Sequence, residues 1–165
     1  MKKEAGFSLV ELLMVITIIA ILMIVGGVTW SSYMPTYRLR AAVEELQATI
    51  QMAKLKAIKE NAVTTVRFNG TDSYRAWLDD DEDGAYDAAD DEIFIQKELP
   101  PQVSLLAATD AGFAQLNSRG LPNAGAMSFR LVNSKDEYLA VQMTVAGSFS
   151  IQTSETGADG TWSDQ

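Results

Sequence analysis

The feature that most constrains this chain is an apolar stretch close to its N-terminus. Residues 7–30 are almost wholly apolar, and no charged residue lies between Leu12 and Tyr37. At about 1.5 Å of rise per residue, a helix of this length crosses the hydrocarbon core of a bilayer. Lys2 and Lys3 precede the stretch. The positive-inside rule therefore predicts a cytoplasmic N-terminus, with the rest of the chain on the other side of the membrane.

Glu11 is the only charged residue in this stretch, and three interpretations differ in the role they give it. The first is a secretory signal peptide removed after its apolar part, with Val25 and Gly27 as the small residues before the cut. The second is a plain transmembrane anchor in which Glu11 snorkels to the lipid headgroups. The third gives Glu11 a positively charged partner on another molecule. A carboxylate at the centre of a spanning helix costs about 2.5–3.5 kcal/mol, and the first two interpretations gain nothing from it, so the third is favoured.

Residues 6–13 read Gly-Phe-Ser-Leu-Val-Glu-Leu-Leu and closely resemble the type IV prepilin signature, G-F-T-L-x-E. The resemblance implies that a prepilin peptidase cuts between Gly6 and Phe7 and that Phe7 is then N-methylated. It also implies that Glu11 pairs with the N-terminal amine of a neighbouring subunit during assembly. The physical argument agrees, because an α-amino group with a pKa of about 8 is largely charged at neutral pH. Its attraction to a carboxylate is strong in a helix bundle of low dielectric constant.

Periodicity predicts the organisation of the mature chain and its fold class. The prepilin resemblance implies that residues 1–6 are the leader peptide and that 7–30 form a helix that serves as membrane anchor and filament core. Apolar residues at three- and four-residue steps predict an amphipathic continuation of that helix over 31–60. Period-two alternation and turn signals then predict a β domain over 61–152, with a loose polar tail at 153–165. Strands are expected at 63–68, 74–78, 93–99, 103–107, 127–132, 138–145 and 149–152. The predicted fold class is α+β, with the long helix packed on an antiparallel sheet or sandwich.

The acidic residues of the chain concentrate in one segment, residues 79–92, which we call the acidic loop. It holds nine Asp and Glu residues and no Lys or Arg, so its charge equals the net charge of the whole chain, −9. Its start has the spacing D-x-D-x-D-G, in which alternate carboxylates can surround a hard cation while Gly84 permits a sharp turn. The predicted Ca²⁺ ligands are Asp79, Asp81, Asp83, Asp87 and Asp90, with Asp91 and Glu92 as substitutes. A solvated acidic surface and, more remotely, a catalytic carboxylate pair are the alternatives.

The composition excludes several function classes. The chain has no histidine and no cysteine. Ser-His-Asp triads, Cys-His dyads, thiolate zinc sites, iron–sulfur clusters and disulfides are therefore excluded. Outside the acidic loop the charges sum to zero, so nucleic acid is not an expected partner. We expect a protein that is not an enzyme, with no cofactor other than the candidate Ca²⁺.

The chain also resembles minor pilins and pseudopilins of the GspH/FimT type beyond its N-terminus. The resemblance rests on the helix end at Ala53–Asn61, the D-x-D-x-D-G loop and the glycine-bearing stretch Leu116–Gly120. It implies a structural subunit of a type IV pilus or a type II secretion pseudopilus, anchored in the bacterial inner membrane with its domain in the periplasm. The implied partners are other pilin or pseudopilin subunits, the prepilin peptidase, the inner-membrane assembly platform and membrane lipid.

Two alternatives to this function stay open. Some proteins of this type bind DNA for natural transformation through a C-terminal G-R-x-R motif. The matching residues here are Gly147-Ser148-Phe149-Ser150, in which serines replace both arginines. The other alternative is a secreted or membrane-anchored binding domain, which a cut near Gly27 would indicate.

Overall fold

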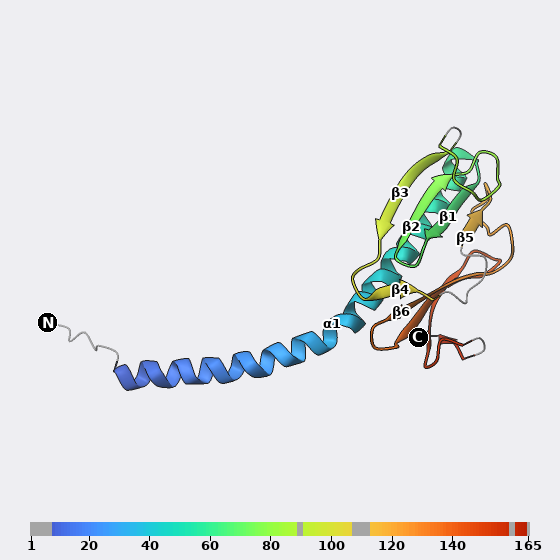
Figure 1. Ribbon diagram of the computed structural model, residues 1–165. Coiled ribbons are helices and arrows are strands. Elements are labelled where there is room, and N and C mark those ends of the chain that lie inside the picture. The colour runs from blue at the N-terminus through green and yellow to red at the C-terminus, as the bar shows by residue number, and fades with distance from the viewer. Residues whose placement is uncertain (1–7, 89–90, 107–112, 159–160, 165) are drawn as a thin grey trace. The chain divides into compact units, whose positions relative to one another are not determined.

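The computed structural model describes residues 8–88, 91–106, 113–158 and 161–164, without the side chains of 25–29. Gly6, Phe7 and Asp90 lie outside the described residues. In the described residues one long helix precedes the strands along the chain (Figure 1). The elements are α1 (Leu9–Glu60), β1 (Thr64–Asn69), β2 (Ser73–Leu78), β3 (Glu92–Glu98), β4 (Val103–Leu105), β5 (Phe113–Leu116), β6 (Met127–Asn133), β7 (Tyr138–Met143), β8 (Phe149–Ser154) and β9 (Ser163–Asp164). The chain divides into two units, Met1–Met34 and Pro35–Gln165.

The first unit contains the N-terminal part of α1. The helix begins after Ser8, whose carbonyl accepts hydrogen bonds from the backbone N–H groups of Glu11 and Leu12 at 3.0 and 3.1 Å. Every described side chain from Leu9 to Ile24 is exposed. Within the described residues, no helix is long and apolar enough to cross a membrane. The spanning segment predicted over 7–30 therefore stays a prediction.

The second unit contains the C-terminal part of α1, and here the helix buries one face. The buried positions recur at three- and four-residue steps, as expected for a helix with one apolar stripe. They include Leu39, Ala42, Val43, Leu46, Thr49, Ile50, Ala53 and Ala57. Asn61 ends the helix in the left-handed region, with φ of 51°, a conformation that Asn adopts more readily than most residues. Ile58, expected on the buried face, is half exposed.

Two antiparallel sheets complete the second unit. Their strand orders are β3-β2-β1-β5 and β4-β6-β7-β8-β9. The Asn69-Gly70 turn joins β1 to β2, with Asn69 paired to Ser73. Strand β6 alternates buried and half-buried residues along its length, the period expected of a sheet with one covered face. Side chains from α1 and from both sheets form one hydrophobic core, in which the Phe68 and Phe129 rings lie 5.5 Å apart. The predicted α+β class is confirmed.

The C-terminal segment differs from its prediction. A loose tail is expected from residue 153, but β8 continues to Ser154 and pairs with β9 through Thr153 and Ser163. The Ser154 hydroxyl is buried and accepts a hydrogen bond from the backbone N–H of Gly157 at 3.0 Å. Polar side chains thus bond to backbone groups of the segment and hold it in place, where composition alone predicts a mobile end.

Candidate functional site

The first candidate site is the apolar surface of the N-terminal helix. Its large apolar side chains are between 42% and 76% exposed from Leu9 to Ile24. Glu11 lies in the first turn of α1, where a negative charge interacts favourably with the helix dipole. The Thr17 hydroxyl donates to the Leu13 carbonyl at 2.8 Å, so this polar group is satisfied within the helix. Glu11 is therefore the only charged side chain on an otherwise apolar surface over these residues.

The second candidate site is the acidic loop, which connects β2 to β3. The chain reverses direction at Glu82 and Gly84, which have φ values of 62° and 72°. The Gly84 carbonyl accepts a hydrogen bond from Arg67 of β1 at 3.0 Å. Tyr86 packs edge-on against Trp77, with ring centroids 5.9 Å apart. These contacts hold the middle of the loop against the first sheet.

Among the described acidic residues of the loop, Asp79 is the one that is buried, with 1% of its surface exposed. Its Oδ2 atom accepts three hydrogen bonds. The donors are the Thr65 hydroxyl at 2.5 Å, the Gly84 backbone N–H at 3.1 Å and the Gln115 amide at 3.1 Å. Its Oδ1 atom is buried without a hydrogen-bond partner in the described structure. Strand β1, the loop itself and β5 thus fix one oxygen of Asp79 and leave the other unsatisfied.

Asp79, Asp81 and Asp91 come together in the folded loop. Each offers one carboxylate oxygen, and these oxygens all lie within 4.8 Å of one another. Asp91 is oriented by two backbone groups, since it accepts hydrogen bonds from the N–H groups of Asp80 at 3.3 Å and Asp87 at 2.7 Å. The three-residue group therefore joins the beginning of the acidic loop to its end.

The carboxylates that the D-x-D-x-D-G spacing indicates overlap only in part with this group. Asp79 and Asp81 are predicted ligands and lie in it, whereas Asp83 and Asp87 lie outside it. Asp83 instead accepts a hydrogen bond from the backbone N–H of Ala85 at 2.6 Å, which closes a local turn. Asp91, named only as a substitute, takes the third place.

The electrostatics of Asp81 reflect this crowding. The backbone N–H of Asp83 donates to Asp81 and by itself lowers the pKa of the Asp81 carboxyl. Desolvation and the negative charges of Asp83 and Asp79 outweigh that hydrogen bond, so the pKa of Asp81 is raised above its ordinary value. The crowding of carboxylates thus disfavours the ionisation of Asp81.

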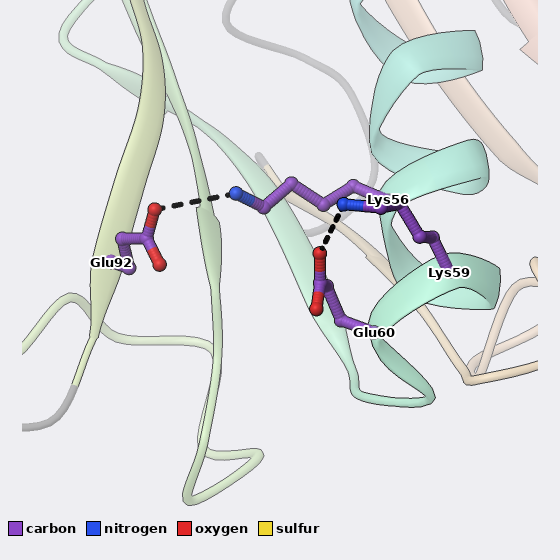
Figure 2. A network of polar contacts seen from close by, with 4 residues as sticks. All are labelled: Lys56, Lys59, Glu60 and Glu92. Atoms are coloured by element: carbon purple, nitrogen blue, oxygen red, sulfur yellow. Dashed lines mark hydrogen bonds and ion pairs between the residues drawn. The ribbon is translucent and has the colours of Figure 1, made fainter.

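The far end of the acidic loop contacts the end of α1. Figure 2 shows Lys56 of α1 reaching toward Glu92 at the start of β3, with 3.3 Å between Nζ and Oε1. The Lys56 ammonium also lies 5.0 Å from the centre of the Phe94 ring. One helical turn on, Lys59 pairs with its neighbour Glu60 at 2.9 Å. Solvent screens the charges of these pairs, which are at least partly exposed, so the pairs contribute little to stability.

Sequence reasoning missed the residues that hold Asp79. Thr65 and Gln115 lie 14 and 36 positions from Asp79 along the chain. Both meet it only because β1 pairs with β2 on one side and with β5 on the other. A strand Thr and a strand Gln carry no motif, so no signal in the sequence could single them out.

A long helix with an exposed apolar first part, followed by an antiparallel β domain, defines the class of pilin-like subunits. Two solved structures share this fold. The type IV minor pilin FimU of Pseudomonas aeruginosa superposes with a TM-score of 0.60 and 12% identity, over 74% of this chain and 97% of that one. The minor pseudopilin EpsH of the Vibrio cholerae type 2 secretion system gives a TM-score of 0.53 and 14% identity, over 70% and 97%. A search of the curated proteins finds no match.

The family follows from the sequence models that match. The model of the type II transport protein GspH matches residues 42–148, and the prokaryotic N-terminal methylation motif matches residues 1–27. The chain belongs to the GspH family. It is a structural subunit of a type IV pilus or of a type II secretion pseudopilus, in a family of filament subunits rather than enzymes.

Proposed function

We propose that the subunit is held in the inner membrane by residues 7–30, with its N-terminus in the cytoplasm and the unit Pro35–Gln165 in the periplasm. The observation that supports this proposal is the exposed apolar surface from Leu9 to Ile24. A continuous apolar surface of this kind needs lipid or other apolar helices around it. Lipid covers it before assembly, and the helices of neighbouring subunits cover it once the assembly platform has added the subunit to a filament.

The proposal includes a processing step at the N-terminus. The methylation motif matched at residues 1–27 supports a cut between Gly6 and Phe7 by the prepilin peptidase and methylation of Phe7. The cut leaves the apolar helix on the mature chain and creates an α-ammonium group at its end. The intact mass of the protein from its native envelope tests this step. We expect a chain that starts at Phe7 and carries one methyl group, whereas a chain that starts near Val28 would mean that the helix is discarded.

The remaining part of the proposal concerns Glu11. Its carboxylate pairs with the N-terminal ammonium of a neighbouring subunit, since each charge is costly alone among apolar helices and attracts the other strongly. The variant Glu11→Gln keeps the size of the side chain and removes its charge. We expect normal cleavage and methylation of Glu11→Gln but loss of its incorporation into filaments, measured by shearing filaments from cells and quantifying the subunit in them.

A matched control is available within the same N-terminal segment. Glu4→Gln removes an identical charge from the leader peptide, which the mature chain lacks under this proposal. We expect it to be incorporated like the wild type. Incorporation of Glu11→Gln at the wild-type level would overturn the pairing of Glu11 with a neighbouring ammonium group while leaving the processing step intact.

A further inference from the structure

The two carboxylate oxygens of Asp79 have unlike surroundings, although the side chain is buried as a whole. Thr65, Gly84 and Gln115 all donate to Oδ2, whereas Oδ1 has no hydrogen-bond partner in the described structure. Buried polar atoms are nearly always paired, and an unpaired carboxylate oxygen is among the most costly to leave. Because three donors already occupy Oδ2, Oδ1 is the oxygen that Asp79 can offer to a ligand.

The surroundings of Asp79 indicate the charge of that ligand. Asp81 and Asp91 bring further carboxylate oxygens to within 4.8 Å of the Asp79 oxygen and of each other. Three negative groups around one point repel each other, and a cation between them removes the repulsion and satisfies the unpaired oxygen at once. Arg67, the arginine of β1, does not serve as the cation between these carboxylates, because it donates to the Gly84 carbonyl and lies over the Phe113 ring.

We propose that Asp79, Asp81 and Asp91 bind one Ca²⁺ ion. Calcium prefers oxygen ligands at about 2.3–2.6 Å, so oxygens on opposite sides of the ion lie about 4.6–5.2 Å apart. The oxygens of this group all lie within 4.8 Å of one another, which is close enough for one Ca²⁺ ion to contact all three. Magnesium demands near-octahedral geometry at about 2.0–2.1 Å and gives up its water ligands reluctantly, so a group of three carboxylates favours calcium. Calcium takes 6–8 oxygens, and water or further oxygens of the acidic loop complete its coordination.

The bound ion adds a link where the acidic loop leaves the sheet. Asp79 directly follows β2 and Asp91 directly precedes β3, next to the paired residues Leu78 and Glu92. Calcium therefore closes the acidic loop at its base and reinforces the pairing of the edge strand β3 with β2 at this end. The site does not involve the N-terminal helix, so the calcium proposal can be tested independently of membrane insertion and filament assembly.

The test is calcium binding by the full chain in micelles of a non-ionic detergent. Calorimetric titration with CaCl₂ should give one site per chain with a dissociation constant of about 10⁻⁴ M or lower. The thermal midpoint should rise by several degrees in about 1 mM CaCl₂ at constant ionic strength. MgCl₂ at the same concentration should give less than half of that rise. No heat and no shift in about 10 mM CaCl₂ would overturn the proposal.

The decisive variant is Asp79→Asn. Its amide oxygen can still accept from Thr65, Gly84 and Gln115, while its NH₂ group takes the place of Oδ1 and cannot bind a cation. We expect it to fold without calcium as the wild type does, and to bind Ca²⁺ at least about tenfold more weakly. Unchanged affinity would overturn the assignment of Asp79 as a ligand.

Two further variants serve as a charge control and as a second test of the ligand assignment. Asp80→Asn removes the same charge from the same loop at an exposed residue outside the group, and it should keep the calcium response. Asp81→Asn changes an exposed ligand and should fold even if Asp79→Asn does not, yet it should also bind at least about tenfold more weakly. Equal losses in Asp80→Asn and Asp81→Asn would indicate general screening of an acidic surface and overturn the proposal.

Discussion

Gly120 shows how one residue without a side chain sets the distance between a loop and helix α1. It lies in the left-handed region, with φ of 71°. A Cβ atom at this position would lie 2.6 Å from Cγ of Lys54 and 2.9 Å from Cδ1 of Ile58. The neighbouring Asn117 fixes the loop by accepting hydrogen bonds from the backbone N–H groups of Arg119 and Leu121, at 2.9 and 3.1 Å. The stretch Leu116–Gly120 therefore has a packing role against α1.

Gly120→Ala is expected to destabilise the unit Pro35–Gln165 by about 2–5 kcal/mol. The left-handed backbone costs an Ala residue about 1–2 kcal/mol, and the contacts with Lys54 and Ile58 add a cost of about 1–3 kcal/mol for overpacking. Urea unfolding of this unit measures the change. Gly125→Ala is the control, since Gly125 also has a positive φ, of 100°, but nothing lies within 4 Å of its added Cβ. Equal losses in the two variants would show that crowding at α1 contributes nothing.

Asp79 illustrates what the sequence can and cannot reveal at this scale. The spacing of acidic residues predicts a cation site within residues 79–92. The nine acidic residues look alike in the sequence, however, and tertiary structure buries Asp79 alone among those that are described. The selection is made by Thr65 and Gln115, which hydrogen-bond to Asp79 from two different strands.

Helix α1 is one element with two kinds of surface. Up to residue 24 its described side chains are all exposed, whereas from residue 35 on it buries one stripe against two sheets. Leu46 in that stripe is 0% exposed, and Leu55 on the opposite side is 67% exposed. The same residue type therefore performs different tasks on the two sides of one helix.

Leu46→Ala should lower the free energy of unfolding of the unit Pro35–Gln165 by about 2–5 kcal/mol, because it leaves a cavity in the core. Leu55→Ala should change it by less than about 0.5 kcal/mol, because it removes no buried contact. Both variants have the same change in helix propensity, so their difference measures packing alone. Comparable losses in both would contradict the burial of this stripe.

Elements were predictable from the sequence where their periodicity is long and strong. The helix ending at Glu60 and seven of the strands follow from spacing and turn residues. Strands β5 and β9 were not predicted, because they have only 4 and 2 residues and take their conformation from pairing with β1 and β8. Short strands of this kind depend on neighbours that the local sequence does not contain.

For the unit Pro35–Gln165 as a whole, the stability should fall in alkaline solution because of Tyr74. Burial raises the pKa of the Tyr74 hydroxyl above its ordinary value, although a hydrogen bond with Thr49 at 3.4 Å opposes the shift. Lys97 acts in the same direction, since its contact with Glu45 raises the pKa of its ammonium group. Both groups hold their protons more tightly in the folded state than in the unfolded state.

The unfolded state therefore releases these protons first as the pH rises past about 10, and the free energy of unfolding declines. One retained proton corresponds to a slope of about −1.4 kcal/mol per pH unit. Tyr74→Phe should make the slope of the free energy of unfolding against pH less steep between about pH 9.5 and pH 11. The change should be at most the slope that corresponds to one proton. Urea unfolding across this range measures it, with Tyr37→Phe, at a 70% exposed residue, as the control. An unchanged slope in Tyr74→Phe would assign the decline to other groups.

The exposed apolar surface of α1 from Leu9 to Ile24 affects how precisely identical helices can be positioned when they pack together. A helix that is apolar on every side can rotate about its axis or slide along it and still bury nearly the same area against a neighbour. Hydrophobic burial alone then favours packing of the helices but does not fix one rotation or one axial position. Glu11 breaks this symmetry in both angle and height, since it is the single charged side chain between Leu9 and Ile24.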